Sequence, residues 1–118
     1  MFLKNYFCCA VPENVKMSLD DLRYLSALVS DVKLLRATDG HRYCYFFPRD
    51  DKMVDSIQKM LAKYKIFGAK HLTHYDLYSQ NIVRVRCRTQ KQSATIRNFA
   101  DDVMKMKSVL EDMNTLSR

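Results

Sequence analysis

The sequence predicts an α+β fold in which a central antiparallel β-sheet of about four to five strands is flanked by helices. Two observations predict this class. Apolar residues recur at helical spacing in three segments, and runs rich in β-branched and aromatic residues come in pairs between these segments. The resulting order is helix, hairpin, helix, hairpin, helix, which is typical of an antiparallel sheet covered by helices.

Length and composition predict a single folded domain. The chain has 118 residues, 47% of them apolar, with only two prolines and two glycines. Such a composition is typical of a globular unit rather than of a disordered tail. A chain of this length usually forms one domain. We therefore expect one domain over residues 1–118.

The helices are expected where apolar stripes follow a residue that can cap a helix. Ser18 is the expected N-cap of the first helix, and Asp50 or Asp51 that of the second. Ser93 is expected to open the third helix, and Gly68 to provide a left-handed cap after the second. The three stripes are Leu22, Leu25, Leu28 and Val29; Val54, Ile57, Leu61 and Tyr64; and Ile96, Phe99, Ala100 and Val103.

Strands are expected at residues 6–11, 32–37, 42–47, 71–77 and 82–88, from their apolar and β-branched content. Asp39-Gly40 is the strongest turn signal, and residues 78–81 are expected to form the other hairpin turn. Both faces of residues 43–47 are apolar, which favours a central strand that is buried on both sides. Residues 107–116 either continue the third helix or supply an edge strand at 108–110.

The charge balance favours a polyanionic partner. Lysine and arginine total 20 against 13 acidic residues, which gives a net charge of +7 and a pI near 9.3. The apolar start of the chain is too short for a signal peptide or a membrane span, so no membrane partner is expected. No glycine-rich phosphate-binding loop occurs, so the chain is expected to have no ATPase activity and to be no enzyme.

The cysteines predict neither a disulfide framework nor a metal site. They stand at Cys8, Cys9, Cys44 and Cys87, without a C-x-x-C pair, which is typical of reduced thiols in an intracellular protein. A zinc site using His71 and His74 lacks paired thiols, and residues three apart on a strand face opposite sides. We therefore expect no metal, no cofactor and no catalytic residue.

A basic segment at residues 82–99 is the most informative stretch of the chain. Val83, Val85 and Cys87 fall on one face of a strand, and Arg84, Arg86 and Arg88 on the other. A polar turn at residues 89–92 then leads into a helix, whose first backbone N–H groups lack partners within the helix. Cations beside such N–H groups are typical of phosphate binding, although a solvated strand face would show the same alternation.

The residues expected to contact DNA in this segment share hydrogen-bond donors or positive charge. They are Arg88, Thr89, Gln90, Lys91, Gln92, Ser93, Thr95 and Arg97. Gln90 and Gln92 additionally carry amides that can pair with a base edge. A second basic loop flanks the Asp-Gly turn with Arg36, His41 and Arg42. Two basic loops together favour nucleic-acid binding more than either does alone.

Five segments in order resemble the origin-binding domain of the polyomavirus large T antigens and papillomavirus replicative helicases. They are SLDDLRYLSALV, RATDGHRYCYFF, DDKMVDSIQKMLAKYKIF, HLTHYDLYSQNIVRVRCR and QKQSATIRNFADDV. The resemblance covers about residues 18–106 and leaves the flanks, 1–17 and 107–118, outside it. It implies two DNA-contacting loops, the first running from Thr38 to Arg42 and the second from Thr89 to Ser93.

The resemblance implies sequence-specific binding to double-stranded DNA at the repeats of a viral replication origin, in the host nucleus. The domain would recruit a replicative helicase whose remainder lies outside this chain, and it would self-associate weakly on DNA. The second loop departs from the polyomavirus pattern, which is rich in histidine and arginine. Gln90, Lys91 and Gln92 stand there instead, so the base preference need not be the same.

Two other functions are consistent with the sequence. One is a nicking endonuclease of the rolling-circle type, with His71 and His74 at a metal and Tyr75 or Tyr78 as the nucleophile. The other is an RNA-binding module, which would stack bases on Tyr43 and Tyr45 of the strand expected at residues 42–47. Cleavage of single-stranded DNA would distinguish the first, and tyrosine substitutions would distinguish the second.

Overall fold

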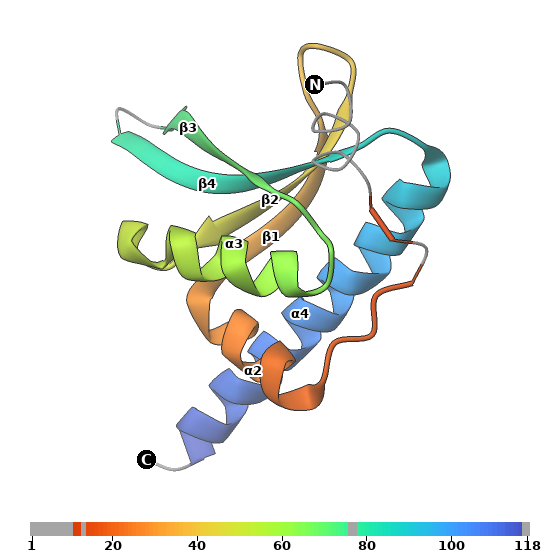
Figure 1. Ribbon diagram of the computed structural model, residues 1–118. Coiled ribbons are helices and arrows are strands. Elements are labelled where there is room, and N and C mark those ends of the chain that lie inside the picture. Colours follow the sequence, from red (N-terminus) through yellow and green to blue (C-terminus); the bar gives the residue numbers. More distant parts are fainter. Residues whose placement is uncertain (1–10, 13, 76–77, 117–118) are drawn as a thin grey trace.

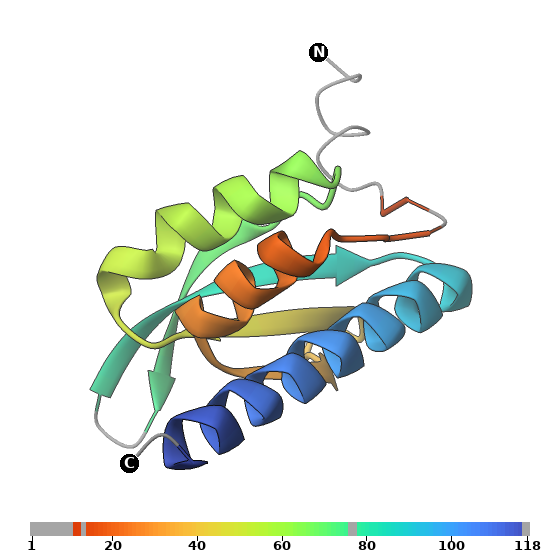
Figure 2. The ribbon, with the colours of Figure 1, turned by 90° about the horizontal axis from the view of Figure 1, so that it is seen from below.

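The computed structural model describes residues 11–12, 14–75 and 78–116, and it shows an open four-stranded antiparallel sheet with three helices against one face (Figures 1 and 2). The elements in order are α2 (Leu19–Leu28), β1 (Val29–Arg36), β2 (Arg42–Pro48), the 3₁₀ turn η1 (Asp51–Met53), α3 (Val54–Lys63), β3 (Ala69–Tyr75), β4 (Tyr78–Cys87) and α4 (Gln90–Leu116). The strand order across the sheet is β1-β2-β4-β3. The predicted α+β class and element order are therefore confirmed.

The first hairpin is set by the Asp-Gly pair, as predicted. The backbone N–H of Ala37 donates to the carbonyl of His41, and Gly40 takes a left-handed conformation with φ of 85°. Glycine adopts that conformation without the steric cost of a Cβ atom. The β1–β2 loop is therefore residues 37–41, closed by the hydrogen bond between Ala37 and His41, and Arg36 and Arg42 face each other across the strands that it joins.

The helix ends differ from the prediction in two places. Val29 was expected to end the first apolar stripe, but it is the first residue of β1. Lys65, rather than Gly68, takes the left-handed conformation after α3, with φ of 62°. A Cβ atom on Gly68 would lie 2.4 Å from Cγ1 of Val83, so this glycine permits close packing of the chain against β4. The predicted Ser18 cap is confirmed, because its hydroxyl accepts from the backbone N–H of Asp21. Asp50 accepts from the backbone N–H of Lys52 and caps η1, which leads into α3, whereas the N-cap position of α3 itself is Met53.

The second half of the chain corrects three further expectations. Residues 78–81 are not a turn but the start of β4, where Asn81 pairs with Leu72. Helix α4 begins at Gln90 rather than at Ser93, so residues 90–92 form its first turn. It continues to Leu116, which replaces the edge strand considered at residues 108–110. The strand expected at 6–11 falls almost wholly outside the described residues.

The core lies between the sheet and the helix layer. Val83, Val85 and Cys87 point from β4 into it, where Phe46 of β2 packs against Phe99 of α4. The predicted strand alternation is thus confirmed on this face. The prediction that the central strand is buried on both sides is confirmed only at Tyr43, whereas Tyr45 and Phe47 on the same face are partly exposed, because all three helices lie on the other side of the sheet (Figures 1 and 2). None of the helices in the described part of the chain is long and apolar enough to cross a membrane.

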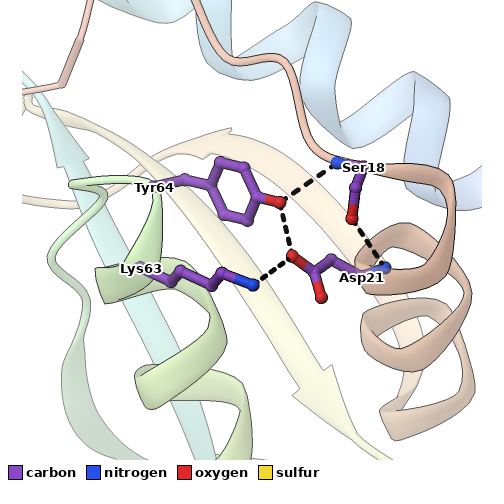
Figure 3. Close-up of polar contacts among 4 residues, drawn as sticks. All are labelled: Ser18, Asp21, Lys63 and Tyr64. Atoms are coloured by element: carbon purple, nitrogen blue, oxygen red, sulfur yellow. Dashed lines mark hydrogen bonds and ion pairs between the residues drawn. The ribbon is translucent and has the colours of Figure 1, made fainter.

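A polar cluster ties the beginning of α2 to the end of α3 (Figure 3). The Asp21 carboxylate accepts from Nζ of Lys63 at 2.7 Å and from the hydroxyl of Tyr64. That hydroxyl also accepts from the backbone N–H of Ser18. The hydrogen bonds from Lys63 and then Tyr64 lower the pKa of Asp21 below its ordinary value of 3.8. The cluster fixes the two helices relative to each other on the side away from the open sheet face.

Candidate nucleic-acid interface

The two basic segments meet at one end of the sheet. Strand β2 begins where the antiparallel β4 ends, so Arg42 lies opposite Cys87. The β1–β2 loop and the beginning of α4 therefore lie beside each other (Figure 1) and enclose a cleft of about 230 Å³. Its lining is Arg36, Gly40, His41, Arg42, Cys87, Arg88, Thr89, Gln90 and Ser93. Segments about fifty residues apart in sequence thus form one concave surface.

The cleft concentrates positive charge. Arg36 and Arg42 stand directly across from each other on β1 and β2, and Arg88 follows the end of β4. Two like charges directly opposite each other destabilise a sheet, so the Arg36–Arg42 pair does not contribute to the stability of the fold. Among the described residues, no carboxylate forms an ion pair with any of these three arginines. Their charge is therefore available to an anion from outside the chain.

The first loop is held in place by Asp39. One oxygen of its carboxylate accepts from the backbone N–H of His41 at 2.9 Å, and the other from the Tyr43 hydroxyl at 2.7 Å. The bond from Tyr43 is the main cause that lowers the pKa of Asp39 below its ordinary value. His41 is exposed and contacts Arg86, whose Nη2 donates to the imidazole at 3.0 Å from Nε2. These contacts tie the loop to β2 and β4 through the protein's own side chains.

The second segment is a capped helix beginning rather than a loop. The Thr89 hydroxyl accepts from the backbone N–H of Gln92 at 3.1 Å, and the Gln92 side chain accepts from the backbone N–H of Arg88 at 2.6 Å. This reciprocal pattern resembles a capping box. Thr89 is therefore the N-cap in place of the predicted Ser93. The Gln92 amide is engaged within the protein, whereas Gln90 is exposed and lines the cleft.

Ser93 contributes a buried hydroxyl to the wall of the cleft. Its side-chain oxygen has no partner of hydrogen-bond geometry among the described residues, and the residue is only 4% exposed. Burial raises the pKa of the adjacent Cys87 thiol, and interactions with Ser93 and Arg42 oppose that rise. A buried polar group without a partner is uncommon in native proteins. Because Ser93 lies beside the first turn of α4, its hydroxyl adds a hydrogen-bond donor to the backbone N–H groups of that turn.

The remaining predicted residues do not line this cleft. Lys91, Gln92 and Thr95 lie on the flank of α4 that faces Val11 and Pro12. Thr95 donates to the Lys91 carbonyl within the helix. The last two, Thr38 and Arg97, are both exposed, one in the β1–β2 loop and the other on α4 about two turns after Gln90.

Two further arginines, Arg84 and Arg86, lie next to the cleft but were not among the residues expected to contact DNA. They lie on the sheet face that carries no helix, because Val83 and Val85 beside them on β4 point into the core, while Arg88 lies beyond the strand end. The Arg84 guanidinium lies 4.3 Å from the centre of the Tyr43 ring, a cation–π distance. The alternation of residues 83–88 already indicated this position, because it placed Arg84 and Arg86 together on one face of the strand. Tyr43 lies on the same face, since it pairs with Arg86.

The histidines considered for a metal site point to different faces. His71 pairs with Ile82 and His74 with Ser79 in a regular register, so the two histidines are three positions apart on one strand and face opposite sides. The His74 ring contacts the Ser79 hydroxyl at 2.9 Å. Within the described residues, no three histidine, cysteine or acidic side chains come together as a metal site would require. Cys44 and Cys87 are free, buried thiols, and Cys8 and Cys9 lie outside the described residues.

Comparison with models of protein families, with curated proteins and with solved structures finds no match for this chain. The function must therefore be argued from the geometry of the cleft and of the surfaces next to it.

Proposed function

We propose that this domain binds double-stranded DNA at the end of the sheet where the β1–β2 loop meets the beginning of α4. The observation that carries the proposal is the cleft itself, in which three arginines surround the first turn of a helix and form no ion pair with a carboxylate of the described residues. Duplex DNA carries a dense row of phosphates, and arginine and helix N-termini are frequent phosphate contacts. A protruding loop beside a helix end also offers two points of contact along one groove.

The roles that we propose for the cleft residues follow from the position and exposure of their side chains. Arg36, Arg42 and Arg88 hold phosphates, because they line the cleft and no carboxylate in the part of the chain that the structure describes pairs with them. His41 and Gln90 are exposed at its edge and read bases, where an amide can pair with adenine through two hydrogen bonds. Gln92 is removed from the base-reading set because it caps the helix.

The biological setting rests on the sequence resemblance. By that resemblance, the duplex is a set of repeats at a viral replication origin in the host nucleus, and the domain recruits a helicase carried by a longer protein. Neighbouring copies on adjacent repeats would then strengthen binding. The cleft geometry supports the duplex contact and is independent of this setting.

The test is the salt dependence of duplex affinity. Arg36→Ala and Arg88→Ala each remove one exposed guanidinium from the cleft. Each should weaken binding to all duplexes and flatten the slope of log K against log salt by about one unit, since one phosphate contact releases about one counterion. Fluorescence anisotropy of a labelled duplex at several salt concentrations measures the slope.

Arg49→Ala is the matched control, because Arg49 is exposed just beyond the opposite end of β2 and its loss changes the net charge equally. An equal flattening by Arg49→Ala would show that binding depends on total charge alone and would overturn the proposal. Selection of duplexes from a random pool adds the second arm. Gln90→Ala should broaden the selected sequence, whereas Arg49→Ala should not.

A further inference from the structure

The face of the sheet opposite the helices carries a row of aromatic rings. Tyr43, Tyr45 and Phe47 alternate along β2 and all point to this face, while Cys44 and Phe46 point into the core. The ring centres are 6.1 Å apart between Tyr43 and Tyr45, and 6.4 Å apart between Tyr45 and Phe47. The three helices of the described part of the chain all lie against the other face of the sheet (Figures 1 and 2). The strand therefore presents an aromatic ladder on an open surface.

The ladder is not uniformly accessible. Tyr43 is only 5% exposed, and the Arg84 guanidinium covers one side of its ring. Tyr45 and Phe47 are partly exposed. The accessible planar groups in sequence across the face are therefore the Arg84 guanidinium, the Tyr45 ring and the Phe47 ring.

Positive charge borders the ladder on both sides. Lys33 lies opposite Tyr45 on β1, with its Nζ 6.0 Å from the centre of the Phe47 ring. Arg84 lies opposite Tyr45 on β4, and Arg86 opposite Tyr43. Two carboxylates lie near this group: Asp31 forms an ion pair with Lys33 at 3.8 Å, and Asp39 accepts from the Tyr43 hydroxyl at 2.7 Å. Three cations against these two carboxylates leave the face with a net positive charge.

We infer that this helix-free sheet face binds single-stranded nucleic acid, with bases stacked on Tyr45 and Phe47 and phosphates held by Lys33, Arg84 and Arg86. Aromatic rings between cations are typical of surfaces that bind single strands, because every unpaired base offers a flat face for stacking. A duplex offers no such faces along its length, since its bases stack on one another. The interleaved charge also distinguishes this face from an apolar surface for a protein partner.

This face is continuous with the cleft. The Tyr43 hydroxyl reaches Asp39 in the β1–β2 loop, and Arg86 contacts His41 in the same loop. A strand separated from a duplex at the cleft would therefore meet the ladder without crossing the helix layer. The single-strand inference uses different side chains from the duplex proposal and does not depend on it.

The experiment measures binding of labelled twelve-nucleotide oligomers, oligo-dT and oligo-U, to the whole chain by fluorescence anisotropy. Tyr45→Ala should weaken binding about fivefold or more, as expected for loss of one stacked base. Tyr24→Ala is the matched control, because Tyr24 is 48% exposed on α2 in the helix layer. Equal loss on both oligomers identifies a general single-strand site, and preference for oligo-U identifies RNA as its ligand.

A second variant tests the site at an exposed position, where a substitution is not expected to alter folding. Lys33 is exposed, so Lys33→Gln should leave the circular dichroism spectrum and melting temperature unchanged while flattening the salt dependence of oligo-dT binding. Lys59→Gln, at an exposed position on α3, should change neither. Photocrosslinking of an iodouracil-containing oligomer should label a peptide from β2.

The outcomes separate this inference from the duplex proposal. Unchanged oligomer affinity in folded Tyr45→Ala and Lys33→Gln proteins would overturn the sheet-face site, as would crosslinks confined to residues 88–97. Loss of duplex binding in Arg88→Ala with normal oligomer binding would support two distinct surfaces. Loss of oligomer binding in Arg88→Ala, with none in Tyr45→Ala, would assign single strands to the cleft and contradict the inference.

Discussion

The two faces of β2 show how one strand divides its side chains between folding and binding. Phe46 is fully buried and packs against Phe99 of α4, whereas Tyr45 and Phe47 stay partly exposed beside arginines and a lysine. Both sets of side chains belong to one backbone, and aromatic rings occur on both faces, with Tyr43, Tyr45 and Phe47 on the open face and Phe46 on the core face. The difference arises because the helices cover one face only. An aromatic side chain of β2 can therefore be assigned to the core or to a binding surface only once it is known which face of the sheet the helices cover.

The largest expected difference between the two faces is in stability. Phe46→Ala should lower the free energy of unfolding by about 3–5 kcal/mol, because it removes a buried ring and leaves a cavity. Tyr45→Ala should cost well under half as much, since its ring already meets solvent. Urea denaturation of both variants measures the contrast. Equal losses would mean that the ladder is a second core, which would break the comparison.

A smaller effect should appear where the open face joins the cleft. Tyr43→Phe keeps the ring beneath Arg84 and removes only the hydroxyl that Asp39 accepts. The β1–β2 loop should then loosen, with faster amide exchange at Gly40 and His41 and weaker duplex binding. Tyr24→Phe is the control on the helix layer and should change neither quantity. Unaltered exchange in Tyr43→Phe would show that the loop is ordered without this bond.

The smallest expected effect concerns the helix layer and acid. The pKa of Asp21 is lowered in the folded protein, so its stabilising contribution is complete above the ordinary value of 3.8 and is lost as pH falls through the lower, folded value. Asp21→Asn should therefore reduce stability at neutral pH and make the decline below about pH 4 less steep. Melting temperatures from pH 7 to pH 2 test this. A parallel downward shift at every pH would count against the pKa argument.

Local signals were sufficient for much of the fold. The Asp39-Gly40 pair predicted the first hairpin, and Ser18 predicted the start of α2. The start of α4 was predicted wrongly, although the sequence contains the signal. Thr89 and Gln92 stand at the spacing of a capping box, and this spacing takes precedence over an isolated serine at residue 93.

Other features depended on packing that one sequence does not specify. Gly68 suggested a helix cap, but its role depends on how closely Val83 approaches from another strand. An alternating run of tyrosine and phenylalanine fits both a doubly buried strand and an open ladder, and the placement of the helices decides between them. The meeting of the two basic segments follows from the pairing of Arg42 with Cys87, which is a tertiary contact.

The most direct test of duplex recognition is amide chemical-shift mapping of the labelled domain during titration with a selected duplex. The proposed site predicts that the largest shifts cluster in two separate segments, residues 38–42 and 88–93, and that residues of α2 and α3 stay unchanged. Shifts concentrated on the helix layer or at the β3–β4 end of the sheet would contradict it.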